Sequence, residues 1–297
     1  MKIGYPCINR SLSCKGNRTF RLKSYSEERL QQTIQNNLDC LSRILHFNLD
    51  HKLLFFRISS DLIPFASHPI CTYPWQKKFQ NRFEELGRFI MKNDMRISMH
   101  PDQFVVLNTL QDIVFKRSVA ELAYHTEILD LMKLDATAKI QLHVGGVYGD
   151  KVKSIERFVK RFQTLNTPLK RRLVVENDEK SYSIQDCLRI HKKIRIPILF
   201  DYFHHTLLNG QESLTYVLEA CKKTWGRRDG IPMVDYSSQK PHIVRGSHAE
   251  HLNPTDFKDF LHCSRPYDFD IMLEIKDKEK SAIQALQMIE NDPCIIR

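Results

Sequence analysis

Short apolar runs recur along the chain, and the stretches between them place apolar residues at helical spacing. The region 171–205 shows the pattern clearly. Its apolar runs at 173–175 and 196–200 are each followed by an acidic residue, Glu176 and Asp201. Between the runs, the apolar residues fall on one face of a helix. This pattern predicts a strand, a helix and a second strand, and such a connection makes the two strands parallel.

The same alternation extends over the whole chain. We expect strands at about 2–6, 53–58, 95–100, 139–144, 172–176, 196–201, 231–236 and 269–275, and helices near 26–47, 76–93, 110–135, 152–166, 182–193, 212–225, 255–262 and 277–290. Eight strands alternating with eight helices predict an α/β fold, a single (β/α)8 TIM barrel over residues 1–297. A doubly wound sheet is disfavoured, because the loop at 9–19 contains only Gly16 and lacks a glycine-rich phosphate motif.

The ends of the predicted strands carry most of the candidate chemistry. These ends and the loops after them hold Tyr5, Asn9, His68, His100, His143, Glu176, Asp201, His204, Asp235, His248 and Glu274. Because the carboxyl ends of barrel strands face one mouth, these side chains are expected to converge. Carboxylates that lie close together cannot all ionise without a counter-charge. Metal ions supply that charge most simply, so the sequence predicts a metal cluster at the carboxyl-terminal face.

The donor types narrow the choice of metal. Imidazoles and carboxylates without thiolates fit Zn²⁺, Mn²⁺ or Fe²⁺ better than Ca²⁺, and the histidines are too many for a simple Mg²⁺ site. The candidates exceed what one ion can bind, so roughly two or three ions are expected, an arrangement that suits phosphodiester cleavage. The helical histidines are expected to be structural or superficial: His46, His51, His125, His191 and His262. His205 could either support His204 or pack in the barrel, and His251 ranks below His248.

The net charge of +10 and the pI near 9.2 favour a polyanionic partner. A generic basic surface is an equally good explanation of charge alone. Basic residues in or beside the strand-end loops are the candidates for backbone contacts with a nucleic acid: Arg10, Lys15, Arg18, Arg21, Lys151, Lys153 and Arg245.

The cysteines, the lengths of the apolar runs and the N-terminus indicate in which cellular compartment the protein is expected. The eight cysteines are scattered without a C-x-x-C pair, and several, such as Cys40, Cys187 and Cys221, fall on apolar helix faces. They are expected to be reduced core thiols in a cytosolic or nuclear protein, and a cysteine zinc site is disfavoured. No apolar run approaches the roughly 18–20 residues of a membrane helix. The N-terminus is typical of a strand and not of a signal peptide.

Several motifs, in order and at successive strand ends, carry a resemblance to a known family. They are IGYPCIN at 3–9, FRISSDLIPFASHP at 56–69, SMHPDQF at 98–104, LHVGGVYGDK at 142–151, VVENDE at 174–179, FDYFHH at 200–205, VDYSSQ at 234–239, GSHAEHL at 246–252 and MLEIKDKE at 272–279. Together they span almost the whole chain, which resembles the ultraviolet damage endonucleases. More distantly, the layout is similar to endonuclease IV and to xylose-isomerase-like barrels.

The resemblance implies an activity and a site. A family member would use metal-activated water to nick damaged double-stranded DNA immediately 5′ of a cyclobutane dimer, a 6-4 photoproduct or an abasic site. Metal ligands by matching motif would be His68, His100, His143, Glu176, Asp201, His204, Asp235, His248 and Glu274, with His100, His143, Glu176, Asp201 and Glu274 as the catalytic set. Gln103 and Phe104 would probe the duplex, and Tyr5 and Asn9 would lie near the flipped nucleotides or the scissile phosphate.

The cofactor expected from the resemblance is a group of about two or three divalent metal ions. Mn²⁺ is the preferred candidate, and Zn²⁺, Mg²⁺ and Co²⁺ are the alternatives. We expect a monomer, because the substrate would be a bent duplex. Its expected location is the cytoplasm, on the nucleoid of a prokaryote, or the nucleus of a eukaryote.

The chain also departs from the family pattern. Some members carry K-x-H-Y-S on the seventh strand, whereas this chain has Met233 and Asp235 in place of the lysine and the histidine. A carboxylate can bind the same metals as an imidazole, but it adds negative charge. Phe104 stands where other members have tyrosine, so a ring can still wedge into the duplex without a hydroxyl contact.

Two other functions fit parts of the sequence. A metal-dependent sugar isomerase or epimerase would also place carboxylates and histidines at the strand ends of a barrel. The basic charge and the loop at 101–104 count against it. A non-catalytic nucleic-acid-binding barrel would not need so many metal-ligating residues.

Overall fold

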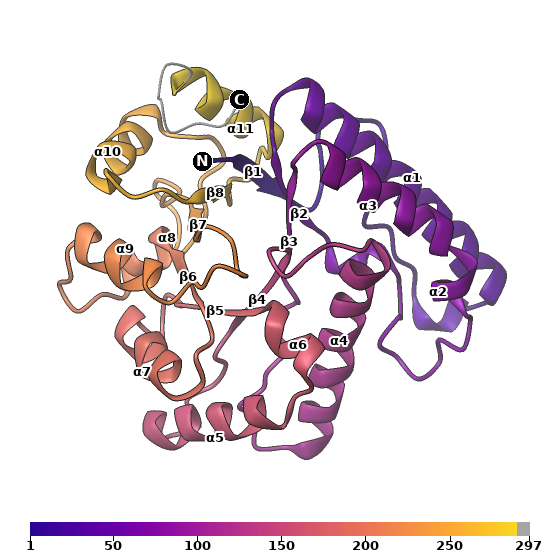
Figure 1. Ribbon diagram of the computed structural model, residues 1–297, viewed down its shortest axis with the longest axis horizontal. Helices are drawn as coiled ribbons and strands as arrows, with labels where there is room; N and C mark the ends of the chain where they lie inside the picture. Colours follow the sequence, from indigo (N-terminus) through magenta and orange to yellow (C-terminus); the bar gives the residue numbers. More distant parts are fainter. Residues whose placement is uncertain (290–297) are drawn as a thin grey trace.

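The computed structural model describes residues 1–289 and shows a closed barrel of eight parallel strands in the order β1 to β8 (Figure 1). The strands are β1 (Ile3–Pro6), β2 (Phe55–Ile58), β3 (Arg96–Met99), β4 (Lys139–His143), β5 (Leu173–Glu176), β6 (Ile198–Asp201), β7 (Met233–Tyr236) and β8 (Asp270–Leu273). The pairing of β1 with β8 closes the sheet. This topology confirms the predicted (β/α)8 fold, and each strand lies inside its predicted range.

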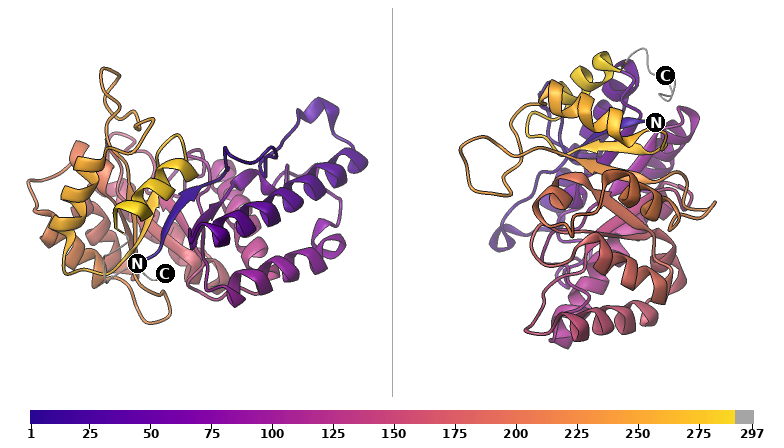
Figure 2. Two further views of the ribbon diagram at one scale, coloured as in Figure 1. Left: turned by 90° about the horizontal axis from the view of Figure 1, so that it is seen from above. Right: turned by 90° about the vertical axis from the view of Figure 1, so that its left-hand side faces the viewer.

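Helices surround the barrel (Figures 1 and 2). They are α1 (Glu27–Asp50), α2 (Trp75–Lys78), α3 (Gln80–Lys92), α4 (Asp112–Leu131), α5 (Lys151–Thr164), α6 (Thr167–Arg172), α7 (Ile184–Ile194), α8 (Tyr202–Leu207), α9 (Leu214–Lys222), α10 (Pro254–Ser264) and α11 (Glu279–Met288), with 3₁₀ turns at Leu22–Ser24 and Ser60–Leu62. The last residue of the helix predicted at 277–290 lies outside the described residues. None of the helices in the described chain is long and apolar enough to cross a membrane.

Two short helices were not predicted. In α6 a proline follows the Asn166 cap, whose side chain accepts a hydrogen bond from the Leu169 backbone. In α8 the cap is Asp201 itself, whose carboxylate accepts a hydrogen bond from the His204 backbone. Each helix has only one turn or two, which is too short for a hydrophobic period to show in the sequence.

The interior of the barrel is layered. One layer is apolar and consists of Phe55, Val174, Leu199, Met233 and Met272. Side chains two residues apart on a strand point to the same face. The next position toward the mouth on the same five strands therefore also points inward, and there the residues are Arg57, Glu176, Asp201, Asp235 and Glu274. A charged layer thus rests directly on an apolar floor.

Ion pairs occupy the opposite end of the barrel, where the strands begin. Arg96 and Asp270 are buried and lie 2.8 Å apart, and Lys139 bonds Asp229 at 2.5 Å. Burial lowers the pKa of Lys139 despite the facing carboxylate. These groups are remote from the mouth, and their pairing explains how charged residues can occupy inward positions at the closed end.

The prediction that all cysteines are reduced is wrong for one pair. Cys14 and Cys40 form a disulfide with a Cα–Cα distance of 5.6 Å. The loop after β1 folds back over α1, so residues 26 positions apart become neighbours, which spacing alone could not reveal. Cys187 and Cys221 are buried free thiols, as predicted.

The packing of α3 against the C-terminal end of α4 makes a testable prediction for Gly87. A Cβ atom at this position would lie 1.8 Å from the Met132 carbonyl oxygen. Alanine normally favours a helix by about 1 kcal/mol over glycine, but overpacking of this kind costs about 1–3 kcal/mol or more. We expect Gly87→Ala to lower the free energy of unfolding, measured by urea denaturation.

A matched control is Gly16→Ala, because the atoms nearest to its added Cβ lie at 3.6 Å or beyond. That variant should unfold at nearly the wild-type urea concentration. A Gly87→Ala variant as stable as the wild type would contradict the packing described here.

Candidate metal centre

Three groups of potential ligands meet at the mouth of the barrel. They are His100, His143 and Glu176; Glu176, Asp201 and His204; and Asp201, Asp235 and Glu274. Within each group the ligand atoms lie within 4.8 Å of one another. The groups are chained through shared members, because Glu176 belongs to the first two and Asp201 to the last two. Seven of the residues that the sequence predicted as ligands are therefore brought together.

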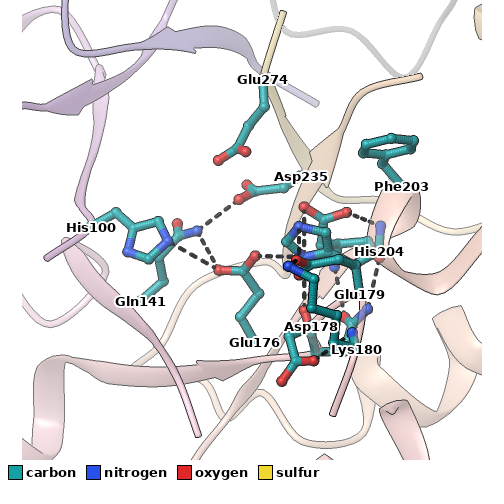
Figure 3. A network of polar contacts seen from close by, with 12 residues as sticks. His100, Gln141, Glu176, Asp178, Glu179, Lys180, Phe203, His204, Asp235 and Glu274 are labelled. Carbon is teal, nitrogen blue, oxygen red and sulfur yellow. Dashed lines mark hydrogen bonds and ion pairs between the residues drawn. The ribbon is translucent and has the colours of Figure 1, made fainter. Parts of the chain in front are cut away.

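Glu176 lies at the centre of this arrangement (Figure 3). Its carboxylate is buried, with one oxygen 3.5 Å from His100 Nε2 and the other 3.3 Å from His204 Nδ1. Gln141 Nε2 donates to the first of these oxygens at 2.8 Å. Burial raises the pKa of Glu176, but the neighbouring imidazoles outweigh burial and hold that pKa well below its usual value. Glu176 is thus placed to bind two ions at once.

Asp201 and His204 are positioned by the start of α8. The Asp201 carboxylate caps the helix, and its second oxygen lies 3.4 Å from His204 Nδ1. The side chain of Asn177 bonds the backbone of Asp201 in both directions at 2.9 Å. Burial raises the pKa of Asp201 to about 8. Burial lowers the pKa of His204, but Asp201 and Glu176 raise it to about 11. The shift of His204 reflects the carboxylates around it, which favour a positive charge at this position.

The ligand atoms of the first two groups, which share Glu176, fit divalent metal ions. His100 Nδ1, His143 Nδ1 and Asp201 Oδ2 are buried and have no hydrogen-bond partner within residues 1–289. Buried polar atoms are nearly always satisfied, so orphans that cluster at one place indicate a missing ligand. Imidazole nitrogens and carboxylate oxygens are suitable ligands for first-row divalent ions.

Two further residues of the site, Arg57 and Gln141, were not predicted from the sequence pattern. Arg57 is buried, and its Nη2 donates to both oxygens of Asp235 at 2.8 and 2.7 Å, while its Nη1 bonds Glu274. Gln141 Nε2 donates to Glu176 and, at 2.7 Å, to Asp235. The sequence signal for these residues is a polar side chain at an inward position of strand β2 or β4. An inward position can be recognised only once the register of the strand is known, because the register determines which face each side chain points to.

The remaining predicted ligands lie at the border of the cluster or beyond it. His248 Nδ1 is 2.9 Å from the Glu274 carbonyl oxygen, and its Nε2 is 3.9 Å from the Glu274 carboxylate. His68 is exposed, accepts a hydrogen bond from the Ile70 backbone at 3.1 Å, and belongs to none of the three groups.

The predicted probing pair is accessible. Gln103 is exposed, and Phe104 has 68% of its surface exposed. Phe104 and His68 border a groove of about 750 Å³, which is lined by Ser67, His68, Pro69, Phe104, Val105, Ile113, Val114, Lys116, Arg117, Ser118, Ala120 and Glu121. A ring this exposed gains little from burial, so its position is not explained by packing at the barrel rim.

The side chains of Tyr5 and Asn9 are hydrogen-bonded within the protein. Tyr5 is fully buried, donates to Asn48 at 2.6 Å and accepts from Asn9 at 2.9 Å. Asn9 also accepts from the backbones of Ser11 and Leu12. In this structure the two residues fasten the loop after β1 to α1.

Histidines behind the site have structural roles. His125 is fully buried on α4, with Nε2 3.0 Å from the Ser60 hydroxyl, which donates to the His100 carbonyl at 2.7 Å. This chain of contacts braces the loop that starts at His100. His205 packs its ring 5.5 Å from that of Phe200, and its buried Nδ1 has no hydrogen-bond partner in the described part of the chain. The packing alternative for His205 is therefore favoured.

A (β/α)8 barrel with imidazoles and carboxylates gathered at its carboxyl-terminal mouth defines a class of barrel enzymes with a site that could hold metal ions, and this class includes nucleases and sugar isomerases. Within this class the family is clear. A family model described as UV-endonuclease UvdE matches residues 1–293, and the chain belongs to this family. It is accordingly a UV-damage DNA repair endonuclease, and DNA is its substrate class.

Similar proteins cover nearly the whole chain. A UV DNA damage endonuclease of Clostridium perfringens is 39% identical over 292 residues, which are 98% of this chain and 71% of that relative. A UV DNA damage endonuclease of Bacillus thuringiensis subsp. konkukian is 32% identical, and the matched region covers 98% of this chain and 95% of that relative. The crystal structure of SacUVDE has a TM-score of 0.95 at 43% identity, covering 99% of this chain and 100% of that chain.

More distant structures share the fold alone. Endonuclease IV from Thermus thermophilus has a TM-score of 0.57 at 18% identity, covering 85% of this chain and 93% of that chain. D-psicose 3-epimerase from Clostridium cellulolyticum has a TM-score of 0.53 at 12% identity, covering 85% of this chain and 86% of that chain. The predicted distant likeness to nuclease and isomerase barrels is confirmed, but it does not favour the isomerase alternative over the family.

The burial of His125 makes a prediction about pH. Burial lowers the pKa of His125 to about 4, below the value of about 6.5 expected in the unfolded chain. The unfolded state therefore binds the proton first, and this part of the stability, present above about pH 6.5, is lost as the pH falls toward 4. We therefore expect the free energy of unfolding of His125→Gln to fall less steeply than that of the wild type as the pH is lowered from about 6.5 to about 4. The difference in slope should be up to about 1.4 kcal/mol per pH unit, measured by urea unfolding of chelator-treated protein.

Both proteins are compared between about pH 4 and pH 6.5. Burial also lowers the pKa of His100 to about 4, but His100 is present in both proteins, so its contribution cancels in the comparison. Parallel stability curves for the two proteins would show that His125 does not titrate as its burial requires.

Proposed function

We propose that the chain nicks the phosphodiester backbone immediately 5′ of cyclobutane dimers and 6-4 photoproducts, and at abasic sites. The observation that carries the proposal is the sharing of Glu176 by two potential ion-binding groups, beside a loop that exposes Gln103 and Phe104. The loop begins at His100, so the damage sensor and a metal ligand are a few residues apart. We further propose that one chain, folded as one barrel domain, acts as a monomer.

About two or three divalent ions are proposed, as expected from the sequence. His100, His143 and Glu176 would hold one of them, and Glu176, Asp201 and His204 would hold another. Mn²⁺ is the first candidate, with Zn²⁺, Mg²⁺ or Co²⁺ as alternatives. When bound, such ions supply charge for the phosphoryl oxygens and generate a nucleophile from water at neutral pH.

The chain itself fixes the geometry of these ligands. Gln141 holds one oxygen of Glu176, and the carbonyl of Asn177 lies 3.0 Å from His204 Nδ1. The start of α8 fixes Asp201 through its cap hydrogen bond. Ligands locked by hydrogen bonds keep their positions when a substrate phosphate enters, which is the preorganisation that phosphoryl transfer needs.

Damage sensing would rest on the exposed loop. A damaged pair stacks and pairs poorly, so opening it costs less than opening a sound pair. Phe104 can wedge into the weakened stack and Gln103 can contact the bases left unpaired. The segment between β7 and α10 projects from the barrel in Figure 2. It contains Arg245, which would contact the phosphates of the DNA. Such contacts give affinity without sequence preference.

The proposal is tested by cleavage of a duplex with one defined lesion. Wild-type protein with Mn²⁺ should cut the damaged strand at a single position 5′ of the lesion, mapped at nucleotide resolution on a sequencing gel. Removal of the ions with a chelator should abolish cleavage, and Mn²⁺ should restore it. Full activity of exhaustively metal-free protein, or a cut on the 3′ side, would contradict the proposal.

Glu176→Gln provides a matched variant for the same assay, because it keeps the shape of the side chain and removes the charge. Its cleavage rate should fall at least about 10²-fold, since the charge acts on the transition state, while lesion binding survives.

Phe104→Ala tests the sensing loop separately. If the ring wedges into the stack, affinity for damaged duplex should fall by about 1–3 kcal/mol, the usual value of an aromatic–base contact. Affinity for undamaged duplex rests on phosphate contacts and should change little. Both affinities are measured by fluorescence anisotropy at one fixed salt concentration.

Tyr216→Ala is the control, because Tyr216 is another exposed aromatic residue, 50% exposed, on the outer helix α9. It should leave both affinities unchanged. An equal loss on damaged and undamaged duplex in Phe104→Ala would mean that the ring has no part in sensing damage.

A further inference from the structure

The third group of potential ligands differs from the other two, because a cation of the protein already lies in it. Asp201, Asp235 and Glu274 make up this group. Arg57 bonds both Asp235 and Glu274 and has only 2% of its surface exposed. Figure 3 shows the carboxylates of Asp235 and Glu274 close together.

The carboxylate of Asp235 is fully engaged by the protein. One oxygen accepts a hydrogen bond from Arg57 at 2.8 Å, and the other accepts from Arg57 and from Gln141, each at 2.7 Å. The first group differs in this respect, since His100 Nδ1 and His143 Nδ1 lack hydrogen-bond partners in the described chain. Asp201 Oδ2 also lacks a hydrogen-bond partner there, and Asp201 is shared by the second and third groups. An ion in the second group can therefore use Asp201, whereas the oxygens of Asp235 in the third group already accept hydrogen bonds from Arg57 and Gln141.

Charge points in the same direction. A divalent ion bound to Asp235 would lie beside a guanidinium in a buried layer, where like charges repel strongly. The four carboxylates of the three groups are Glu176, Asp201, Asp235 and Glu274. Arg57 together with an ion on each of the first two groups already outweighs these negative charges by one unit. A third ion would leave a large uncompensated positive charge.

We propose that Arg57 replaces a metal ion in this site. The chain binds two divalent ions, on the two groups that share Glu176, and the guanidinium holds Asp235 and Glu274 in the third position. Arg57 is then a positioning residue and Asp235 is not a metal ligand, contrary to the prediction from sequence. This inference rests on the metal centre of the proposed function and fixes its stoichiometry.

The test counts bound ions without DNA. Metal-free wild type and Asp235→Asn are saturated with Mn²⁺, freed of excess ion by gel filtration, and analysed by inductively coupled plasma mass spectrometry. Both should retain two ions per chain. A wild-type count other than two, or the loss of an ion in Asp235→Asn, overturns the proposal.

Removal of the guanidinium tests the same point from the other side. Arg57→Met frees Asp235 and Glu274, so its count should rise from two to three at saturating Mn²⁺, and the double variant Arg57→Met/Asp235→Asn should return to two. A folded Arg57→Met protein that retains two ions overturns the proposal. Circular dichroism establishes folding, and if Arg57→Met does not fold, the Asp235→Asn count decides.

Arg82→Met is the matched control. Arg82 also pairs with two carboxylates, Asp39 at 2.8 Å and Glu85, but on the surface of the helical layer. It should leave the count at two. Cleavage of lesion-bearing duplex is measured on the same preparations. A correct ion count without cleavage by the wild type would contradict the proposed function alone, whereas cleavage with a wrong count would contradict this inference alone.

Discussion

The gathering of acidic side chains inside a closed barrel is the constraint on which the rest of the site depends. Glu176, Asp201 and Asp235 are buried one strand apart, with Glu274 beside them. Such a layer is unstable without positive charge, because burial penalises each ionised carboxylate and their mutual repulsion adds to the cost. The protein meets part of this demand with Arg57 and with the imidazoles that face Glu176. The remaining negative charge favours the binding of cations at this site.

The layering of the barrel explains why the charges lie at one depth. Parallel strands of similar length, closed with a regular stagger, bring equivalent inward positions to the same level. Met233 is instructive in this respect. It lies in the apolar floor, fully buried, two residues before Asp235. The absence of a lysine at this position therefore leaves no gap in the site, because the methionine side chain continues the floor beneath the charged layer.

In the proposed function, coupling between damage sensing and cleavage would depend on the loop that begins at His100. His100 faces Glu176, and its carbonyl is held by Ser60, which in turn lies against His125 of α4. Four residues beyond His100, Phe104 is exposed at the edge of a groove. A short loop that is braced at its base, and whose backbone Pro101 also restricts, would keep a fixed distance between the Phe104 ring and the proposed ions. Damage recognition and cleavage would then be coupled without a large conformational change.

The sequence by itself determined the fold and the composition of the site. The alternation of apolar strands and amphipathic helices is repeated over the whole chain, so errors at single boundaries do not change the count of eight. The strand-end rule then placed His100, His143, Glu176, Asp201 and His204 together, because every barrel strand delivers its last residue to the same mouth.

The tertiary structure alone decided which of the gathered groups remain free. Arg57 and Gln141 could not be assigned from sequence, since their roles depend on strand register and on partners 178 and 94 residues away. The same holds for the disulfide between Cys14 and Cys40 and for the burial of Tyr5. A sequence pattern reports what each residue offers, whereas hydrogen bonds across the barrel determine what each has left to offer a ligand. That difference is why Asp235 was predicted as a metal ligand and was found paired with an arginine.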